Sequence, residues 1–386
     1  MAYVRTVKTS SGATAVQIVH SSRKGSRSIE HLGSAHSLEE VEALKAVAAQ
    51  RLVEGQAELD LGLEVAAAAA SGGPLEITGT RMGHLVDALS RAYDALGFAE
   101  AAKGDDVFRQ LVLARIIEPT SKEDSIRVLE EIGIAAPTSY RTIKRRLAVY
   151  AQRSWREGLA TACAARASLG PASLMLYDVT TLYFETHEGD GFREPGFSKE
   201  RRLEPQTTVG LLTDAAGFPL MIEAFEGNKA ETKTMLSTIT SFMAAHQLAD
   251  VAIVADAGMV SEANREAIED AGLSYITNMT DPTPEFVINA YHQLWHVEKS
   301  FRMSKHDLRA RPIYHHKRDS IDVHLNIVFA ALAVTRLIED RTGWSIKRFV
   351  RTTRRYRTVA IRVGQHAITA EDPVPPDLRD ALAQIN

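Results

Sequence analysis

The order of secondary-structure patterns between residues 173 and 255 constrains the fold of this chain more than any other feature of the sequence. The predicted elements are, in order, strands over 173–177, 207–213 and 218–225, a helix over 232–246 and a strand over 251–255. Residues 214–217, Asp-Ala-Ala-Gly, have the composition of a hairpin turn. A three-strand meander followed by a helix and a parallel strand predicts a mixed sheet, because other α/β folds normally alternate strand and helix from the start.

The rest of the chain predicts short strands at the N-terminus and helices on both sides of this sheet. Strands are predicted over 2–8, 13–20, 26–32 and 273–277, and helices over 82–96, 107–116, 121–131, 139–150, 153–168, 261–271, 286–304 and 321–340. Ser37 and Glu40 form a capping-box pattern that opens one more helix. We therefore expect an α/β protein, α+β overall, in four parts: a small basic β-rich unit (1–36), a helical region (37–168), the domain of the mixed sheet (169–342) and a basic C-terminal tail (343–386).

Two of the apolar strands are followed directly by an aspartate, Asp178 after 174–177 and Asp256 after 251–255. Strands that end in this way place both carboxylates at one edge of the sheet. If the strands are neighbours, the carboxylates repel each other unless a divalent cation lies between them, and oxygen ligands suit Mg²⁺ or Mn²⁺. The alternative is that each aspartate only caps a turn.

A third carboxylate, Glu298, lies on the predicted helix 286–304. Tyr291, Glu298 and Lys305 are seven residues apart and share one helix face, and Arg302 lies one turn beyond Glu298. The alternative is an exposed helix with ion pairs.

Basic residues are concentrated in the last third of the chain. The segment from Lys299 to Arg362 has sixteen Lys and Arg against five Asp and Glu, although the whole chain has a net charge of −4. Such segregation predicts a nucleic-acid-binding surface, and the alternative is solvated helix faces. Its clearest helical cluster is Arg348, Arg351, Arg354 and Arg355.

The predicted helices 121–131 and 139–150 and the turn between them resemble a helix-turn-helix. Lys144, Arg145 and Arg146 lie near the start of the second helix, where a recognition helix contacts the major groove and phosphates. An ordinary αα-hairpin with a basic surface has the same pattern.

Composition excludes several other classes of protein. A single cysteine, Cys163, excludes an internal disulfide framework and a Cys-rich zinc site, and it is typical of a reducing cytoplasm. The most apolar run, 327–334, is too short to span a bilayer. We expect a soluble cytoplasmic protein without a membrane partner.

The motifs around the three carboxylates resemble those of one family. Tyr291, Glu298 and Lys305 have the spacing of the Tyr-x2-Arg-x3-Glu-x6-Lys signature of a subgroup of the DDE transposases of bacterial insertion sequences. Further matching stretches are 177–184 around Asp178, 254–258 around Asp256, 227–232 between them and 311–315 after Glu298. In looser form the resemblance extends to the N-terminal strands and to 344–357.

This resemblance implies an RNase H-like catalytic core that cuts and joins DNA at the ends of an insertion sequence. Asp178, Asp256 and Glu298 are then the catalytic and metal-binding residues, with Mg²⁺ or Mn²⁺ as cofactor. Tyr291 and Lys305 are expected to contact DNA phosphates. The implied partners are double-stranded DNA, at transposon ends and target, and a second copy of the chain in a synaptic homodimer. The implied location is the bacterial cytoplasm, on the nucleoid when bound.

The chain departs from the family pattern at two places. Leu294 occupies the position of the signature arginine, for which Arg302 is a possible substitute on the same helix. Only 41 residues separate Asp256 from Glu298, so the strand-rich insertion usual in the subgroup is shortened. Two alternatives therefore stay open: a catalytically impaired DNA-binding derivative of a transposase, and an RNase H-like nuclease that does not join DNA.

Overall fold

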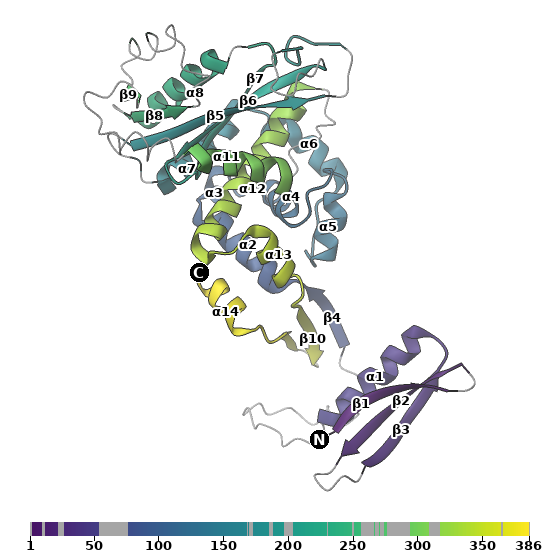
Figure 1. Ribbon diagram of the computed structural model, residues 1–386. Helices are drawn as coiled ribbons and strands as arrows, with labels where there is room; N and C mark the ends of the chain where they lie inside the picture. The colour runs from purple at the N-terminus through teal and green to yellow at the C-terminus, as the bar shows by residue number, and fades with distance from the viewer. Residues whose placement is uncertain are drawn as a thin grey trace. The chain divides into compact units, whose positions relative to one another are not determined.

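The computed structural model of the chain forms two compact units, Met1–Gly73 and Pro74–Asn386, which we describe separately (Figure 1). The structure describes residues 2–9, 12–21, 27–53, 76–167, 169, 173–184, 188–196, 204–229, 231–248, 251–255, 266, 270, 274–275, 294–308, 317–363 and 366–385. Asp256 and Tyr291, like most of the predicted helix 261–271, lie outside the described residues.

Unit 1 is a three-stranded antiparallel sheet with a helix on one face. Its strands β1 (Ala2–Lys8), β2 (Thr14–Ser21) and β3 (Arg27–Ala35) lie in the order β1-β2-β3, close to the predicted bounds. Helix α1 (Leu38–Val53) begins after Ser37, whose Oγ accepts a hydrogen bond from the Glu40 backbone N–H at 3.2 Å. Val41 and Ala48 of α1 pack against Val16 and Ile18 of β2. The helix therefore packs with the N-terminal strands, although the sequence grouped it with the helices that follow.

Unit 2 begins with a strand and six helices. They are β4 (Glu76–Arg81), α2 (Gly83–Ala95), α3 (Phe98–Ala101), α4 (Asp106–Ile117), α5 (Ser125–Glu131), α6 (Tyr140–Tyr150) and α7 (Arg153–Ala167). Side chains fix two of the helix starts, since Asp105 accepts from the Phe108 backbone N–H and Ser139 from that of Thr142. Five of these helices match predicted ones to within a few residues.

Among the described residues, the central sheet of unit 2 has five strands in the order β7-β6-β5-β8-β9. Its elements are β5 (Ser173–Tyr183), β6 (Gln206–Asp214), β7 (Pro219–Glu226), α8 (Glu231–His246), β8 (Val251–Ala255) and β9 (Ser274–Tyr275). The strands β5, β6 and β7 form an antiparallel meander, and β8 lies parallel to β5 on its other side. The predicted mixed sheet, with a meander followed by a helix and a parallel strand, is confirmed.

One strand of this sheet is longer than predicted. The sequence ends it at Tyr177, but β5 continues through Asp178 to Tyr183 because β6 pairs with it as far as Tyr183 and Gln206. Asp178 is therefore inside a strand and not at its end.

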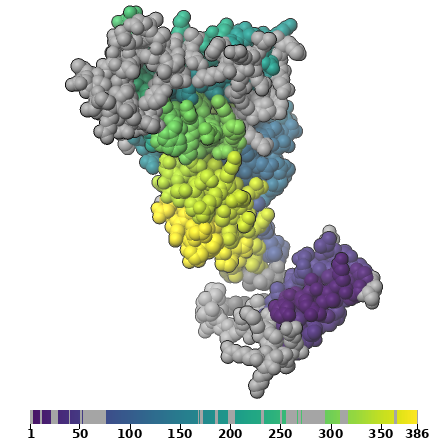
Figure 2. Space-filling view, in the orientation of Figure 1, coloured from purple at the N-terminus to yellow at the C-terminus, as the bar shows by residue number. Residues whose placement is uncertain are grey.

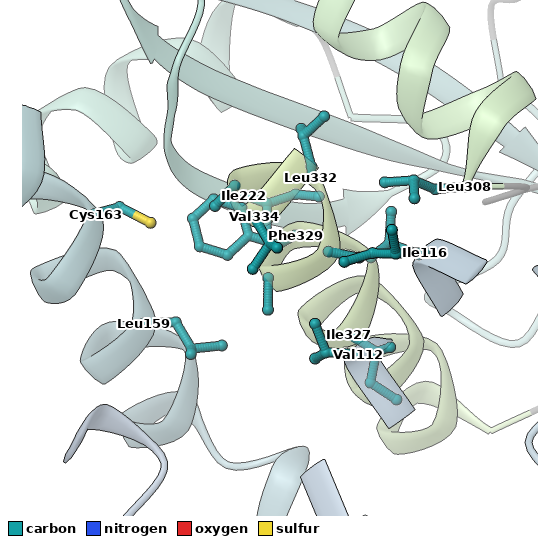
Figure 3. Close-up of a cluster of buried hydrophobic side chains, with 14 of the residues drawn as sticks. Val112, Ile116, Leu159, Cys163, Ile222, Leu308, Ile327, Phe329, Leu332 and Val334 are labelled. Carbon is teal, nitrogen blue, oxygen red and sulfur yellow. The ribbon is translucent and has the colours of Figure 1, made fainter. Parts of the chain in front are cut away.

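Helix α12 (Arg318–Thr342) forms the centre of the core. Ile327 and Phe329 lie among Val112 and Ile116 of α4, Leu159 of α7 and other apolar side chains (Figure 3). The helix is longer than the apolar run read from the sequence and, by length and composition alone, could cross a membrane. Of its most apolar 18-residue window, 94% is buried inside the protein, as in the core helix of a soluble protein.

The segment predicted as a tail is folded. It forms α13 (Ile346–Thr353), β10 (Thr358–Val363), β11 (His366–Glu371) and α14 (Pro376–Ala383). Strand β10 pairs with β4 from the beginning of unit 2, in a three-stranded sheet of order β11-β10-β4. Atoms of this C-terminal part of unit 2 form one continuous region, from yellow-green to yellow, on the face shown in Figure 2.

Candidate functional site

Strand β5, which contains Asp178, and strand β8, which ends one residue before Asp256, are neighbours in the central sheet. They are parallel, and the last pair in their register joins Tyr177 of β5 to Ala255 of β8. Asp178 comes directly after this pair and is half-buried, and its Oδ1 accepts a hydrogen bond from the Val179 backbone N–H at 2.8 Å. Asp256 follows Ala255 in the sequence. The pairing thus brings the strand that contains Asp178 next to the strand that leads to Asp256 in the sequence.

Tyr177 fixes the strand beneath this position. Its ring is buried, and its hydroxyl lies 3.1 Å from the Thr234 Oγ1 of α8. A Cβ atom at Gly210 of β6 would lie 2.1 Å from the Tyr177 hydroxyl oxygen, so only glycine leaves room for the ring. Burial raises the pKa of this phenol, which stays protonated. These contacts position the main chain that leads into Asp178.

Glu298 lies on α11 (Leu294–Arg302), which packs against β5 and β6. Val297 and Phe301 are buried on the inner side of the helix, whereas Glu298 is exposed. The helix that carries Glu298 therefore packs against the strand that carries Asp178.

The β6–β7 hairpin turn holds α11 in place. Ser300 Oγ of α11 donates a hydrogen bond to the Gly217 carbonyl oxygen at 2.7 Å. Gly217 has a φ of +80°, and a Cβ atom there would lie 2.8 Å from the His296 carbonyl oxygen. Arg336 of α12 donates from Nη2 to the carbonyl oxygen of Ala216, in the same turn, at 2.5 Å. Sequence reasoning found the turn but missed its role, for which the glycine at 217 was the only signal.

Charged groups surround the contact between α11 and the β6–β7 hairpin turn. Lys299 of α11 lies 3.3 Å from Glu339 of α12, and Asp214 accepts two backbone hydrogen bonds within the turn. Burial raises the pKa of the Asp214 and Asp340 carboxyls and lowers that of the His296 imidazole. These groups link α12, the turn and α11 by electrostatic contacts.

The other residues of the predicted signature lie near Glu298 in the sequence. Arg302 is exposed at the end of α11. Lys305 lies in the π-helical turn Met303–Asp307, where its Nζ is 5.6 Å from the centre of the Phe301 ring. Leu294, at the position of the signature arginine, is half-buried against the core. Their contact with DNA stays a prediction.

The carboxylate triad as a metal centre also stays a prediction. Within the described ranges no three His, Cys, Asp or Glu side chains are grouped as metal ligands, and Asp256 is outside those ranges. In chemical terms the candidate donors suit a hard divalent ion, since all three are carboxylates.

Helix α6 carries the basic residues of the predicted helix-turn-helix. Lys144, Arg145 and Arg146 are exposed. Lys144 Nζ lies 4.4 Å from the centre of the Tyr140 ring, and Arg146 is 3.5 Å from Asp105. Both α5 and α6 pack on α4. All three side chains are exposed, and their contact with DNA stays a prediction.

The basic C-terminal segment is partly neutralised by acids from other parts of unit 2. Arg354 lies 3.7 Å from both Glu118 and Glu131. Arg348 lies 3.7 Å from Asp377, and its guanidinium stacks 3.8 Å from the centre of the Trp344 ring. Arg351 and Arg355 are exposed and have no ion-pair partner within the part of the chain that the structure describes. Of the predicted cluster of four, these two arginines therefore have the least neutralised charge.

No protein-family model and no curated protein matches this chain. Among solved structures it is similar to a chain of a pre-cleavage Mos1 transpososome, at 14% identity and a TM-score of 0.23, with 77% of this chain and 86% of that chain covered. The Mos1 transposase paired-end complex with the left transposon end gives 13% identity, a TM-score of 0.20 and coverage of 71% and 87%. The Mos1 strand transfer complex gives 12% identity and a TM-score of 0.20, with 76% of this chain and 84% of that chain covered.

Proposed function

We propose that this protein is a DDE transposase that cuts and joins DNA at insertion-sequence ends by metal-dependent phosphoryl transfer. The observation that carries the proposal is the parallel pairing of β5 with β8, in which the last pair, Tyr177 and Ala255, immediately precedes the two candidate aspartates. The packing of α11 on β5 supports Glu298 as the third carboxylate. The strand order is that expected of an RNase H-like core, with the first strand of the meander between the second strand and the parallel strand.

In this proposal Asp178, Asp256 and Glu298 hold two Mg²⁺ or Mn²⁺ ions. When bound, such ions activate the attacking water or 3′-hydroxyl and stabilise the leaving oxygen of an in-line displacement. The protein's own part is positional: β5 carries Asp178, β8 ends one residue before Asp256, and the turn at Gly217 holds the helix that carries Glu298. Since Glu298 is exposed, its carboxylate would be open to a divalent ion without burial of an unpaired charge.

Exposed basic residues supply the proposed DNA contacts. Arg351 on α13, Arg355 just after it, and Lys144 and Arg145 on α6 are exposed and can release counterions from duplex phosphates. The proposed partners are transposon-end and target DNA and a second copy of the chain, and the proposed location is the bacterial cytoplasm.

A plasmid assay separates this function from its two alternatives. A supercoiled donor that carries the element's ends is incubated with the protein and Mg²⁺, and the products are resolved on a gel. Joined products support a transposase, and nicks without joining indicate a nuclease. A band shift without cleavage indicates a DNA-binding derivative, which Leu294 and the short segment before Glu298 would explain. Asp256→Asn is the negative control for cleavage.

A further inference from the structure

Among the described residues, four Lys or Arg side chains are buried, and one of them differs from the others in its contacts. Arg193 has an acid partner, since its Nε lies 2.9 Å from Asp190. Arg336 lies 3.8 Å from Glu339 and donates to a backbone carbonyl oxygen. Arg115, in the last turn of α4, is only 7% exposed, yet it makes no hydrogen bond or ion pair within the described part of the chain. Its guanidinium is therefore a buried charge in need of a counter-charge.

A second buried cation lies beside Arg115. Lys122, in the turn between α4 and α5, is also 7% exposed. Burial lowers the pKa of Arg115 from 12.5 to about 10, so its guanidinium stays charged at neutral pH. Burial and the charge of Arg115 lower the pKa of Lys122 to about 7, so the two side chains are close enough for their charges to repel each other. The two residues concentrate positive charge at one buried corner of unit 2.

The three acids nearest to this corner in the sequence do not neutralise the guanidinium. Glu118 pairs with Arg127 of α5. Asp124 accepts a hydrogen bond from the Thr120 Oγ1 at 3.1 Å, and Glu123 is exposed. A buried charge without a counter-charge costs free energy, so an anion that binds at this corner would stabilise the folded protein.

We infer that Arg115 and Lys122 form a binding site for a phosphate group. The planar guanidinium presents paired N–H groups that match two oxygens of an oxyanion, and the lysine amine adds a compact positive charge when it is protonated. Lys122 supplies this charge whatever other contacts it makes, because the anion is inferred from the guanidinium of Arg115. The phosphate group can belong to inorganic phosphate or to the backbone of DNA, which share this chemistry.

Thermal melting of the full-length protein in inorganic phosphate tests the site. The melting temperature is measured at neutral pH with increasing sodium phosphate, and sodium chloride at equal ionic strength is the reference. Saturating phosphate should raise the melting temperature of the wild type by roughly 2–6 °C above that in chloride. Arg115→Met and Lys122→Met should each lose most of this rise. Arg91→Met, which removes an exposed arginine of α2, is the control and should keep it.

Methionine is chosen because it replaces a buried cation by an apolar side chain of similar length, a change that buried positions tolerate. Arg115→Lys is a second variant, which keeps the charge but loses the paired N–H groups, and it should keep only part of the rise. A short duplex of arbitrary sequence distinguishes the two sources of the phosphate group. If the ligand is a DNA phosphate, Arg115→Met should bind the duplex roughly 10-fold more weakly than the wild type. If the ligand is inorganic phosphate, both proteins should bind the duplex equally and only the melting response should differ.

Identical behaviour of the wild type and Arg115→Met in both assays would overturn the inference. A loss of the phosphate response in Arg91→Met as large as that in Arg115→Met would also overturn it, since the response would then reflect the general charge of the surface. The inference does not rest on the proposed function, because neither measurement needs cleavage. A protein that shows the predicted phosphate response but fails the plasmid assay would refute only the proposed function.

Discussion

Replacement of Gly217 by alanine should destabilise the packing of α11 against the hairpin turn. The loss in free energy of unfolding should exceed the cost of backbone strain alone. Gly217 has a φ of +80°, and for an L-residue a left-handed conformation costs roughly 1–2 kcal/mol. The new Cβ atom would also lie 2.8–2.9 Å from the carbonyl oxygen, carbonyl carbon and Cβ of His296. Two of these three atoms are backbone and cannot rotate away, so α11 must shift, at a further cost of roughly 1–3 kcal/mol.

Gly343→Ala is the matched control for this variant. Gly343 has a φ of +68°, but its Cβ atom would meet nothing within 4 Å. Both substitutions change the unfolded chain in the same way, so that effect cancels between them. The free energy of unfolding of each variant is measured by urea denaturation, with a check that the dependence on denaturant stays the same. Gly217→Ala should lose roughly 1–3 kcal/mol more than Gly343→Ala. Equal losses would refute the close contact between the hairpin turn and α11.

Three further predictions concern the basic residues. The double variant Arg351→Ala, Arg355→Ala should reduce the slope of log affinity against log salt concentration for duplex binding by about 1.8. The double variant Arg348→Ala, Arg354→Ala should reduce this slope less, because acids already pair with these two arginines. Equal reductions in the two double variants would contradict this prediction. Changing Lys144, Arg145 and Arg146 to alanine should weaken binding to a preferred duplex more than to random DNA, and equal losses would indicate phosphate contacts only. Burial, together with the nearby Arg115, lowers the pKa of Lys122 from 10.5 to about 7. Between about pH 7 and 10.5 the unfolded chain therefore binds more protons at Lys122 than the folded chain does. The free energy of unfolding should rise with pH across this range. Lys122→Met should remove that rise in thermal melting, and an unchanged rise would contradict the assignment.

Local features of the sequence predicted most of the secondary structure. Ser139 stands three residues before Thr142, whose backbone N–H it caps, and α6 begins directly after it. The Asp214 side chain accepts from the Ala216 and Phe218 backbone N–H groups, which is the turn chemistry expected of Asp-Ala-Ala-Gly. Such contacts join residues within a few positions of each other, so the sequence displays them.

Contacts between distant residues could not be predicted in this way. The sequence shows a basic segment after Lys299, but not that Arg354 meets Glu118 and Glu131, more than two hundred residues earlier. It shows an apolar strand before Asp178, but the extension to Tyr183 depends on pairing with β6. For the same reason the folding of 343–386 was missed, since β10 is completed by β4.

The sequence predicted the strands of the candidate site, but not the hydrogen bonds that hold α11 in place. The sequence predicted that the strands before Asp178 and Asp256 could be neighbours, and β5 and β8 are paired. It did not predict Ser300 and Arg336, which hold α11 to the hairpin turn through backbone carbonyl oxygens. A hydrogen bond to a carbonyl leaves no pattern in the accepting residue, because every residue has that group.

The central claim is that Asp178, Asp256 and Glu298 act together through divalent metal ions, and parallel measurements of cleavage and binding test it most directly. Asp178→Asn, Asp256→Asn and Glu298→Gln are each compared with the wild type on the same donor DNA in Mg²⁺, with Asp380→Asn and Glu100→Gln as exposed control substitutions. We predict that each triad variant loses cleavage and joining while it binds DNA at least as tightly as the wild type, and that both controls keep full activity. Cleavage by Glu298→Gln or Asp178→Asn at close to the wild-type rate would contradict the triad.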